Sequence, residues 1–414
     1  MAGHAFLRPL VRALLAALAA GGASVAHAAL FSGLDPATGA LNVGSGGPGS
    51  TNIKVEIGSG GRVTVIDNTG ATAPRTYPGV GAINVTSGAG DDLVEFDINS
   101  SQSLALSVAT GAGNAFVKLQ WKVPPGAAST SSTLAMSSGG GNVNVELDFA
   151  SETPTSSFAW SSNFGGGEKL IKGSVAFKPG TINARKNVDL ANLGGGFHLI
   201  SFEVDNEARD ASLAFNSGFA RDVTYKVISD NPTRSLNVDT QLRGARNNVE
   251  ILSASAATTT KFSGGTANTQ GAETNYVVVQ SVLGTLSATL NHAALGASSS
   301  KLNAKFDGAA SLALGGTVTG SIVGDAIKLE TGMPTSSTLL VDTLDGDDSV
   351  DFIAGNRLAG GAGQPRFLLG AGNDVLNVIA AAGSTAIPSI DCGAGEDFAK
   401  ATVGSAAGCE QFGR

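Results

Sequence analysis

The stretch LGAGNDVLNV, residues 369–378, combines a glycine-rich turn, an acidic residue and a strand in which apolar and polar side chains alternate. With Asp374 as the anchor, small residues stand four and two positions before it, and apolar residues two and four positions after it. Thirteen copies of this frame, some of them faint, recur with a mean spacing of about 25 residues. Their anchors are Asp92, Ala115, Val143, Lys169, His198, Asp222, Asn248, Asn275, Ser300, Asp325, Asp348, Asp374 and Asp397. A repeat of this length is typical of a solenoid.

The position two residues after the anchor is apolar in eleven of the thirteen copies. Its occupants are Val94, Val117, Val145, Ile171, Ile200, Thr224, Glu250, Val277, Leu302, Ile327, Val350, Leu376 and Ala399. The following position is mostly polar and begins with Glu95, Lys118, Glu146 and Lys172, which alternate in charge. Because alternate side chains of a strand point to opposite faces, each copy predicts one strand with its apolar residues facing inward.

A second apolar stretch recurs before each glycine turn, as in SLALSVATG at 103–111 and ASLALGG at 310–316. Each repeat therefore predicts two strands, and no convincing helical periodicity competes with them. The predicted fold is all-β: a single parallel β-solenoid (β-helix) of about thirteen rungs with a period of about 25 residues, capped at both ends. At about 4.8 Å per rung it would be roughly 60 Å long.

The ends of the chain carry their own signals. Arg8 and Arg12 precede an apolar run that ends at Ala28, which predicts a Sec-type signal peptide. A membrane anchor is the alternative, but this run is short and no later run reaches the roughly 18–20 apolar residues of a spanning helix. We expect a signal peptide over 1–28, an N-terminal cap with the first strands over 29–80, the solenoid over 81–390, and a last rung with its cap over 391–414.

The two cysteines, Cys392 and Cys409, are 17 positions apart near the C-terminus. In an exported protein such a pair predicts a disulfide rather than a metal site. The net charge of −8 argues against a nucleic-acid partner, because neutralising phosphates requires a basic face. We expect an exported protein, located outside the cell, on its surface or in the periplasm.

Three of the turns resemble a known repeat. The segments GAGNDVL (370–376), GAGDDLV (88–94) and GAGEDFA (393–399) are similar to the hemolysin-type calcium-binding (RTX) nonapeptide G-G-x-G-x-D-x-U-x, and LDGDDSV (344–350) matches it less fully. The resemblance implies calcium held by turn carbonyls and aspartate carboxylates. The candidate ligands it implies are Asp347, Asp348, Asp374, Glu396 and Asp397, with Asp92 at the far end.

The chain also departs from that pattern. The family packs two nonapeptides into each rung, whereas here one turn recurs every 25 or so residues. Several anchors are not acidic, and Lys169 would repel a cation, so calcium is expected only between the last three rungs. The alternative is that the turns are kept for glycine geometry, with Asp and Asn capping local N–H groups.

Function is predicted only broadly. We expect a non-catalytic, structural or adhesive, surface-binding protein whose partner is a cell-surface or matrix polysaccharide or protein. The alternative is a carbohydrate-active enzyme of the polysaccharide lyase or glycosidase type, for which FEVDNEARD at 202–210 is the best acidic stretch; we interpret it as a solvated loop. Arg185, Arg209 and Arg234 fall one period apart and could form a basic column for an anionic glycan.

Overall fold

A computed structural model describes residues 29–230, 234–264, 272–293, 299–308, 311–332, 334–355, 364–381, 384, 388–402 and 405–413. The expected signal peptide over 1–28 lies outside these residues. All regular elements in the described ranges are β-strands, which form two sheets. Within these ranges, no helix has the length and apolar character needed to cross a membrane.

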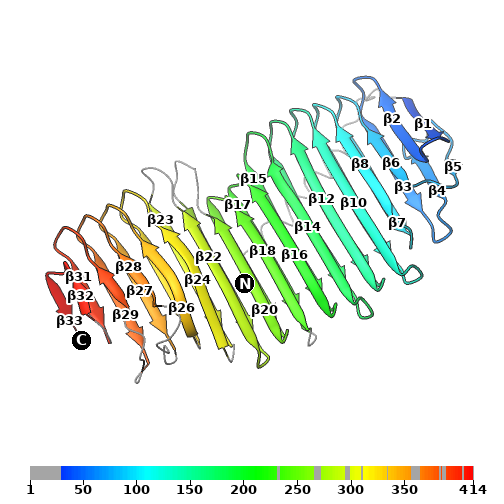
Figure 1. The fold of residues 1–414 in the computed structure, drawn as a ribbon. Helices are drawn as coiled ribbons and strands as arrows, with labels where there is room; N and C mark the ends of the chain where they lie inside the picture. Colours follow the sequence, from blue (N-terminus) through cyan, green and yellow to red (C-terminus); the bar gives the residue numbers. More distant parts are fainter. Residues whose placement is uncertain are drawn as a thin grey trace.

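The first sheet contains one strand from every rung (Figure 1). In spatial order its strands are β1 (Ala29–Asp35), β2 (Ala40–Gly46), β6 (Ala82–Thr86), β8 (Leu104–Thr110), β10 (Ser129–Ser138), β12 (Thr155–Phe164), β14 (Asn183–Asn192), β16 (Asp210–Gly218), β18 (Ser235–Leu242), β20 (Ala257–Gly264), β22 (Thr285–Ala293), β24 (Ser311–Thr319), β26 (Pro334–Asp342), β28 (Arg366–Leu368), β30 (Ser389–Asp391) and β32 (Ser405–Ala407).

The second sheet contains the strands that follow the glycine turns. In spatial order they are β5 (Arg75–Tyr77), β4 (Val63–Asp67), β3 (Thr51–Ile57), β7 (Asp92–Asn99), β9 (Ala115–Val123), β11 (Val143–Ser151), β13 (Lys169–Phe177), β15 (His198–Asn206), β17 (Asp222–Ser229), β19 (Arg246–Ser253), β21 (Ala272–Gln280), β23 (Ser300–Asp307), β25 (Ala326–Thr331), β27 (Ser349–Ala354), β29 (Val375–Ala380), β31 (Phe398–Ala401) and β33 (Gln411–Gly413).

The parallel β-solenoid is confirmed. Neighbouring strands pair in parallel from β2 to β32 in the first sheet and from β3 to β33 in the second. Inward side chains of the two sheets meet in one core, where the rings of Phe149 on β11 and Phe158 on β12 lie 4.6 Å apart. Each of the thirteen predicted copies supplies one strand of the second sheet.

The predicted stacking of like residues is confirmed over most of the length. Val94 pairs with Val117, which pairs with Val145, and all three are fully buried. The polar column beside them also stacks as expected, with Lys118 lying between Glu95 and Glu146. Opposite charges on adjacent strands stabilise this register by a few tenths of a kcal/mol per pair.

Three copies in the middle were placed in the wrong frame. The inward residues are Val223, Asn247 and Thr274, whereas the expected ones were Thr224, Glu250 and Val277. The corner turns of two of these rungs are only three residues long, 219–221 and 243–245, so their strands begin earlier than a full glycine turn allows. Register is recovered at Leu302, which stacks on Thr274 and under Ile327.

The core is not wholly apolar. Lys186 on β14 is buried, and its ammonium group donates a hydrogen bond to the Tyr225 hydroxyl at 2.8 Å. The same nitrogen lies over the rings of Phe202, Phe215 and Tyr225, at 4.7, 5.2 and 4.3 Å from their centroids. Burial holds the pKa of Lys186 well below its usual value, because no water solvates the charged form.

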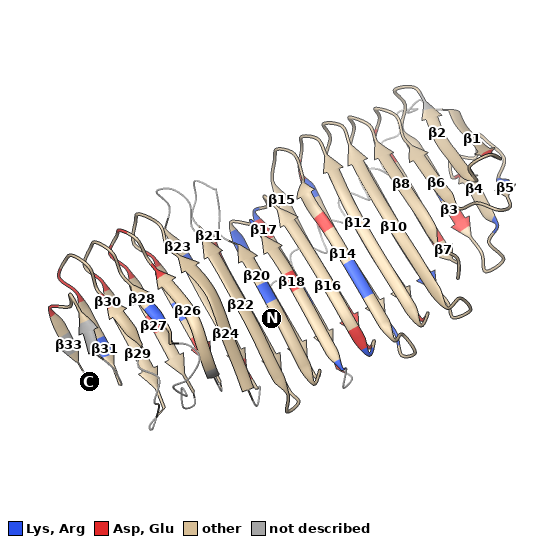
Figure 2. Cartoon of the chain, viewed as in Figure 1, with Lys and Arg blue, Asp and Glu red and all other residues tan. Residues whose placement is uncertain are grey.

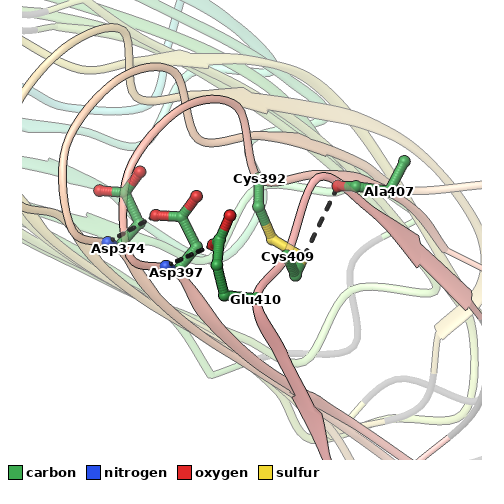
Figure 3. The surroundings of a disulfide bond; sticks show 6 residues. All are labelled: Asp374, Cys392, Asp397, Ala407, Cys409 and Glu410. Atoms are coloured by element: carbon green, nitrogen blue, oxygen red, sulfur yellow. Dashed lines mark hydrogen bonds between the residues drawn. A yellow bond between two sulfur atoms is a disulfide. The ribbon is translucent and has the colours of Figure 1, made fainter.

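Both ends of the stack are closed. At the N-terminal end β1 pairs antiparallel with β2, and β3 pairs antiparallel with β4 as a hairpin. At the C-terminal end Cys392 and Cys409 form the predicted disulfide, with their Cα atoms 5.2 Å apart (Figure 3).

Replacing both cysteines with serine is expected to destabilise the C-terminal rungs by at most about 3 kcal/mol, the loop entropy that such a bridge removes. Because a rung contacts only its neighbours, the loss should remain local. Amide hydrogen exchange should accelerate in β29 and β31 and stay unchanged in β9 and β11. Unchanged exchange in β31 would contradict this role of the disulfide.

Candidate cation site at the corner turns

The C-terminal corner turns stack backbone against backbone. Gly370 and Gly393 both have a φ of +88°, a conformation that favours glycine. A Cβ atom added to Gly370 would lie 1.2 Å from the carbonyl oxygen of Leu344, and one added to Gly393 would lie 1.6 Å from that of Gly370. The glycines of the repeat are therefore required by the close approach of successive turns, whatever else the corner binds.

An inward ladder of side chains links the anchors of successive rungs. The backbone N–H of Asp325 donates to Asp348 Oδ1 at 2.8 Å, that of Asp348 to Asp374 Oδ1 at 2.8 Å, and that of Asp374 to Asp397 Oδ1 at 3.0 Å. The N–H of Asp397 donates in turn to Glu410 Oε2 at 2.8 Å (Figure 3). Each acidic side chain thus accepts a hydrogen bond from the rung before it.

A second, outward ladder runs beside it, and its hydrogen bonds are donated in the opposite direction along the stack. The N–H of Asn373 donates to Asp347 Oδ1 at 2.8 Å, and the N–H of Glu396 donates to Asn373 Oδ1 at 3.0 Å. Asp347 and Glu396 are exposed, whereas Asp348 and Asp397 are buried. The candidate ligands therefore divide between two faces of the corner, and their oxygens cap N–H groups of neighbouring rungs rather than of their own turn.

The inward carboxylates leave one oxygen each without a partner. Oδ2 of Asp348, Asp374 and Asp397 is buried, and no described atom donates to it. Burial raises the pKa of Asp348 to about 7 and that of Asp374 to about 6, with smaller contributions in the same direction from nearby carboxylates. Hydrogen bonds from backbone N–H groups, and from the Thr343 side chain at Asp348, oppose the rise. Buried polar atoms normally have partners, and a proton, a cation or a water molecule would each supply one to this column of oxygens.

In two central rungs a side chain with a hydrogen-bond donor occupies the anchor position at this corner. The buried ammonium group of Lys169 donates to the carbonyl oxygens of Gly141, Gly166 and Gly167 at 3.0, 2.6 and 3.0 Å. In the next rung His198 Nε2 lies 3.1 Å from the carbonyl oxygen of Gly194. Lys169 therefore places a positive charge next to the turn carbonyls of its rung. In the C-terminal rungs the carboxylate at the same position can only accept hydrogen bonds.

The donor set at the C-terminal corner fits calcium in part. Hard oxygens are the ligands that calcium prefers, and it takes six to eight of them. Within the described part of the chain, no three His, Cys, Asp or Glu side chains converge on one point as a ready-made centre. Calcium at Asp348, Asp374 or Asp397 would therefore take most of its ligands from backbone carbonyls and water.

Asp92 differs from the C-terminal aspartates. Its Oδ1 accepts the N–H of Thr51 at 3.1 Å, and its Oδ2 accepts the hydroxyl of Ser87 at 2.5 Å, so both oxygens have donors. Two residues that were not predicted as site residues extend the ladder: Asp325, whose carboxylate accepts the N–H groups of Ser300 and Ser321, and Glu410. The glycine before Asp325 and its place in the period were the signal that could have identified it.

The other candidate residues lie apart from the corner ladder. Glu203 and Asp205 stand on the outer face of β15, so most of the acidic stretch expected as a loop is strand. Lys178 forms ion pairs with Asp205 at 2.8 Å and Glu207 at 3.7 Å. The charged side chains of Glu203 and Asp205 thus lie on an outer face of the stack.

The three arginines do not form one column. Arg234 lies next to Arg209, to whose carbonyl oxygen its N–H donates at 2.8 Å. Arg185 stacks between Ser157 and Ser212 instead, three positions further along the strand. Comparison with known proteins adds no assignment to this geometry: no family model, curated protein or solved structure matches the chain.

Proposed function

We propose that this protein is a non-catalytic, exported β-solenoid that acts as a structural or adhesive rod and binds a surface or matrix polysaccharide or protein. The observation that carries this proposal is the continuous stack, in which one core runs from Leu41 on β2 to Ala401 on β31 beneath outer faces of polar and charged side chains. The ion pairs that Lys178 forms with Asp205 and Glu207 support a solvated face over a catalytic one. Residues 1–28 would direct export and would be removed from the mature protein.

Co-sedimentation tests this role directly. The mature chain, residues 29–414, should sediment with cell envelopes or extracellular matrix and should release no unsaturated or reducing sugar from acidic polysaccharides. Mass spectrometry of the secreted form should place its N-terminus at Ala29. Release of sugar would favour the carbohydrate-active enzyme, and a soluble fraction that binds neither preparation would overturn the adhesive role.

The second part of the proposal is that calcium stabilises the C-terminal corner at Asp348, Asp374 and Asp397, with Asp347 and Glu396 on its outer side. The unpartnered Oδ2 atoms support this, as does Lys169, which supplies a positive charge to the equivalent turn carbonyls of a central rung. When bound, calcium would supply the charge that neutralises the buried carboxylates. The resemblance of these turns to the RTX nonapeptide points to the same ion.

Thermal unfolding with calcium and with a chelator at pH 8 tests the metal. A ligand at 100 times its dissociation constant stabilises a protein by about 2.7 kcal/mol, so we expect the midpoint to rise by several degrees. Magnesium at the same concentration should have a smaller effect, because it demands a tighter octahedral shell. Equal midpoints with calcium and with chelator would remove the metal from the proposal and leave the rod unaffected.

A further inference from the structure

The row of corner turns is interrupted in the middle of the molecule. Five residues, 193–197, connect β14 to β15, but only three connect β16 to β17 and β18 to β19. Figure 1 shows the upper row of turns stepping down after β15. A hollow of about 950 Å³ occupies this step, and we name it the corner notch, defined by Phe197, His198, Phe219, Arg221, Arg246 and Lys301.

The corner notch concentrates positive charge on an otherwise acidic protein. Arg221, Arg246 and Lys301 line it together with the carboxylate of Glu273, and Asp222 beside it pairs with both arginines. Arg243 lies beside it, over the ring of Phe219. In Figure 2 blue segments lie near β17 and β20, whereas red segments line the C-terminal turns. The whole chain has a net charge of −8, so its overall charge repels anions. Any attraction for an anion must come from the basic residues of the corner notch.

The guanidinium groups of the corner notch are held in place. Arg246 forms a two-point contact with the carboxylate of Asp222, in which Nη2 lies 2.7 Å from Oδ2. Arg221 packs over the ring of Phe197 at 4.5 Å. Arg243 lies 5.7 Å from the centroid of Phe219. More than half of the Arg221 and Arg246 side chains remains exposed, at 56% each, so N–H groups are free to meet a ligand.

Apolar and polar groups accompany these charges. The Phe219 side chain is 49% exposed and also lines a second hollow of about 370 Å³ that adjoins the first at Gly194. His198 is 3% exposed, and its Nδ1 has no partner among the described residues. An exposed ring offers apolar area to the C–H face of a sugar, while planar guanidinium groups bind carboxylate or sulfate through paired N–H bonds.

The shape of the corner notch favours a linear polymer. It crosses the starts of five adjacent strands, β15 to β23, and so runs for about 20 Å along the stack at 4.8 Å per strand. These strands pair on both sides with neighbours. They offer no free sheet edge to which an extended peptide could add as a strand.

From these observations we infer that the corner notch binds an acidic polysaccharide through Arg221, Arg243, Arg246 and Lys301, with Phe219 against a sugar ring. This inference rests on the proposed surface-binding role and names its ligand class. The ligand chemistry is a chain of sugars that carry carboxylate or sulfate groups.

Binding of the mature chain to fluorescent oligogalacturonate, to a sulfated oligosaccharide and to neutral dextran tests the inference. At least one of the two acidic oligosaccharides should bind, and its affinity should fall as salt is added. Dextran should not bind. The double variant Arg221→Gln/Arg243→Gln should lose at least tenfold in affinity. The matched variant Arg62→Gln/Arg366→Gln, which removes two exposed arginines elsewhere on the stack, should retain the affinity of the unsubstituted protein.

Three results would overturn the inference: no binding to either acidic chain, equal losses in the two double variants, or equal binding of polyglutamate, which would indicate an acidic protein as the partner. Thermal midpoints of both variants should match that of the unsubstituted protein, so that misfolding is distinguished from lost contacts. A failure here would leave co-sedimentation with envelopes and the calcium response as separate results, so the wider proposal is tested independently.

Discussion

The Asp348→Asn protein is expected to be more stable than the unsubstituted protein when calcium is chelated at pH 8, by about 4 kcal/mol at 1.4 kcal/mol per pKa unit. Asparagine keeps Oδ1 as the acceptor for the N–H of Asp325 and removes a charge that burial disfavours. The amide Nδ2 would take the place of Oδ2, the buried oxygen to which no described atom donates. Urea unfolding measures the difference.

The pH dependence follows from the sign of the shift. A carboxyl group whose pKa is higher in the folded than in the unfolded state opposes folding when it is ionised. For Asp348 this cost is absent below pH 4, grows as the pH rises through its folded pKa of about 7, and is complete above that. The chelated protein should therefore lose stability between pH 4 and pH 8, and the Asp348→Asn protein should lose less.

Calcium should reverse that loss in the unsubstituted protein and have a weaker effect on the Asp348→Asn protein. Asp347→Asn is the matched control under chelation, because Asp347 is exposed and its Oδ1 caps the N–H of Asn373 in either form. A destabilised Asp348→Asn protein in chelator would mean that the ionised carboxylate is favoured in the fold, contrary to the expected sign.

Replacing Lys169 with methionine is expected to cost about 1.5–3 kcal/mol, the usual contribution of hydrogen bonds to a charged group. Three turn carbonyls on half-buried or exposed glycines lose the ammonium group that donates to them, and water can replace part of that loss. The matched control is Lys172→Met on the same strand, whose side chain lies in the outer charged column. That change should stay within about 0.5 kcal/mol, as surface substitutions usually do. Denaturant unfolding of both variants measures the contrast.

A third variant separates charge from packing. Lys169→Asp places a carboxylate beside the carbonyl oxygens of Gly141, Gly166 and Gly167 and should be the least stable form in chelator. Calcium should restore part of its stability and leave Lys169→Met unchanged. If calcium affects both variants equally, the corner of this rung is not equivalent to the C-terminal one.

Much of the fold could be predicted from the sequence, because the repeat places residues of one kind in one column. Val94, Val117 and Val145 are small, β-branched and apolar, and a parallel stack is the arrangement that buries all three at once. The frame failed at Thr224 and Glu250, where the short corners omit the glycine turn. A pattern anchored on a turn cannot locate a strand whose turn is missing.

The candidate site was predicted in part. The acidic anchors were found from their spacing, and the structure places Asp348, Asp374 and Asp397 in one buried file. What their side chains accept could not be read from spacing, because the donors are N–H groups of other rungs. From the sequence alone, Lys169 was interpreted as a residue that would repel a cation. In the structure its ammonium group points toward three carbonyl oxygens and so takes the place that a cation could occupy.

The two corner ladders also bear on how the rod would carry a load. Asp374 accepts from the rung before it, while Asp347 accepts from the rung after it, so neighbouring coils are tied in both directions at one corner. Sliding one coil past the next by a single residue would break both ties and turn every inward side chain outward. Pulled by its ends, such a rod would resist shear along its length and come apart by peeling, one coil at a time, from whichever end yields first.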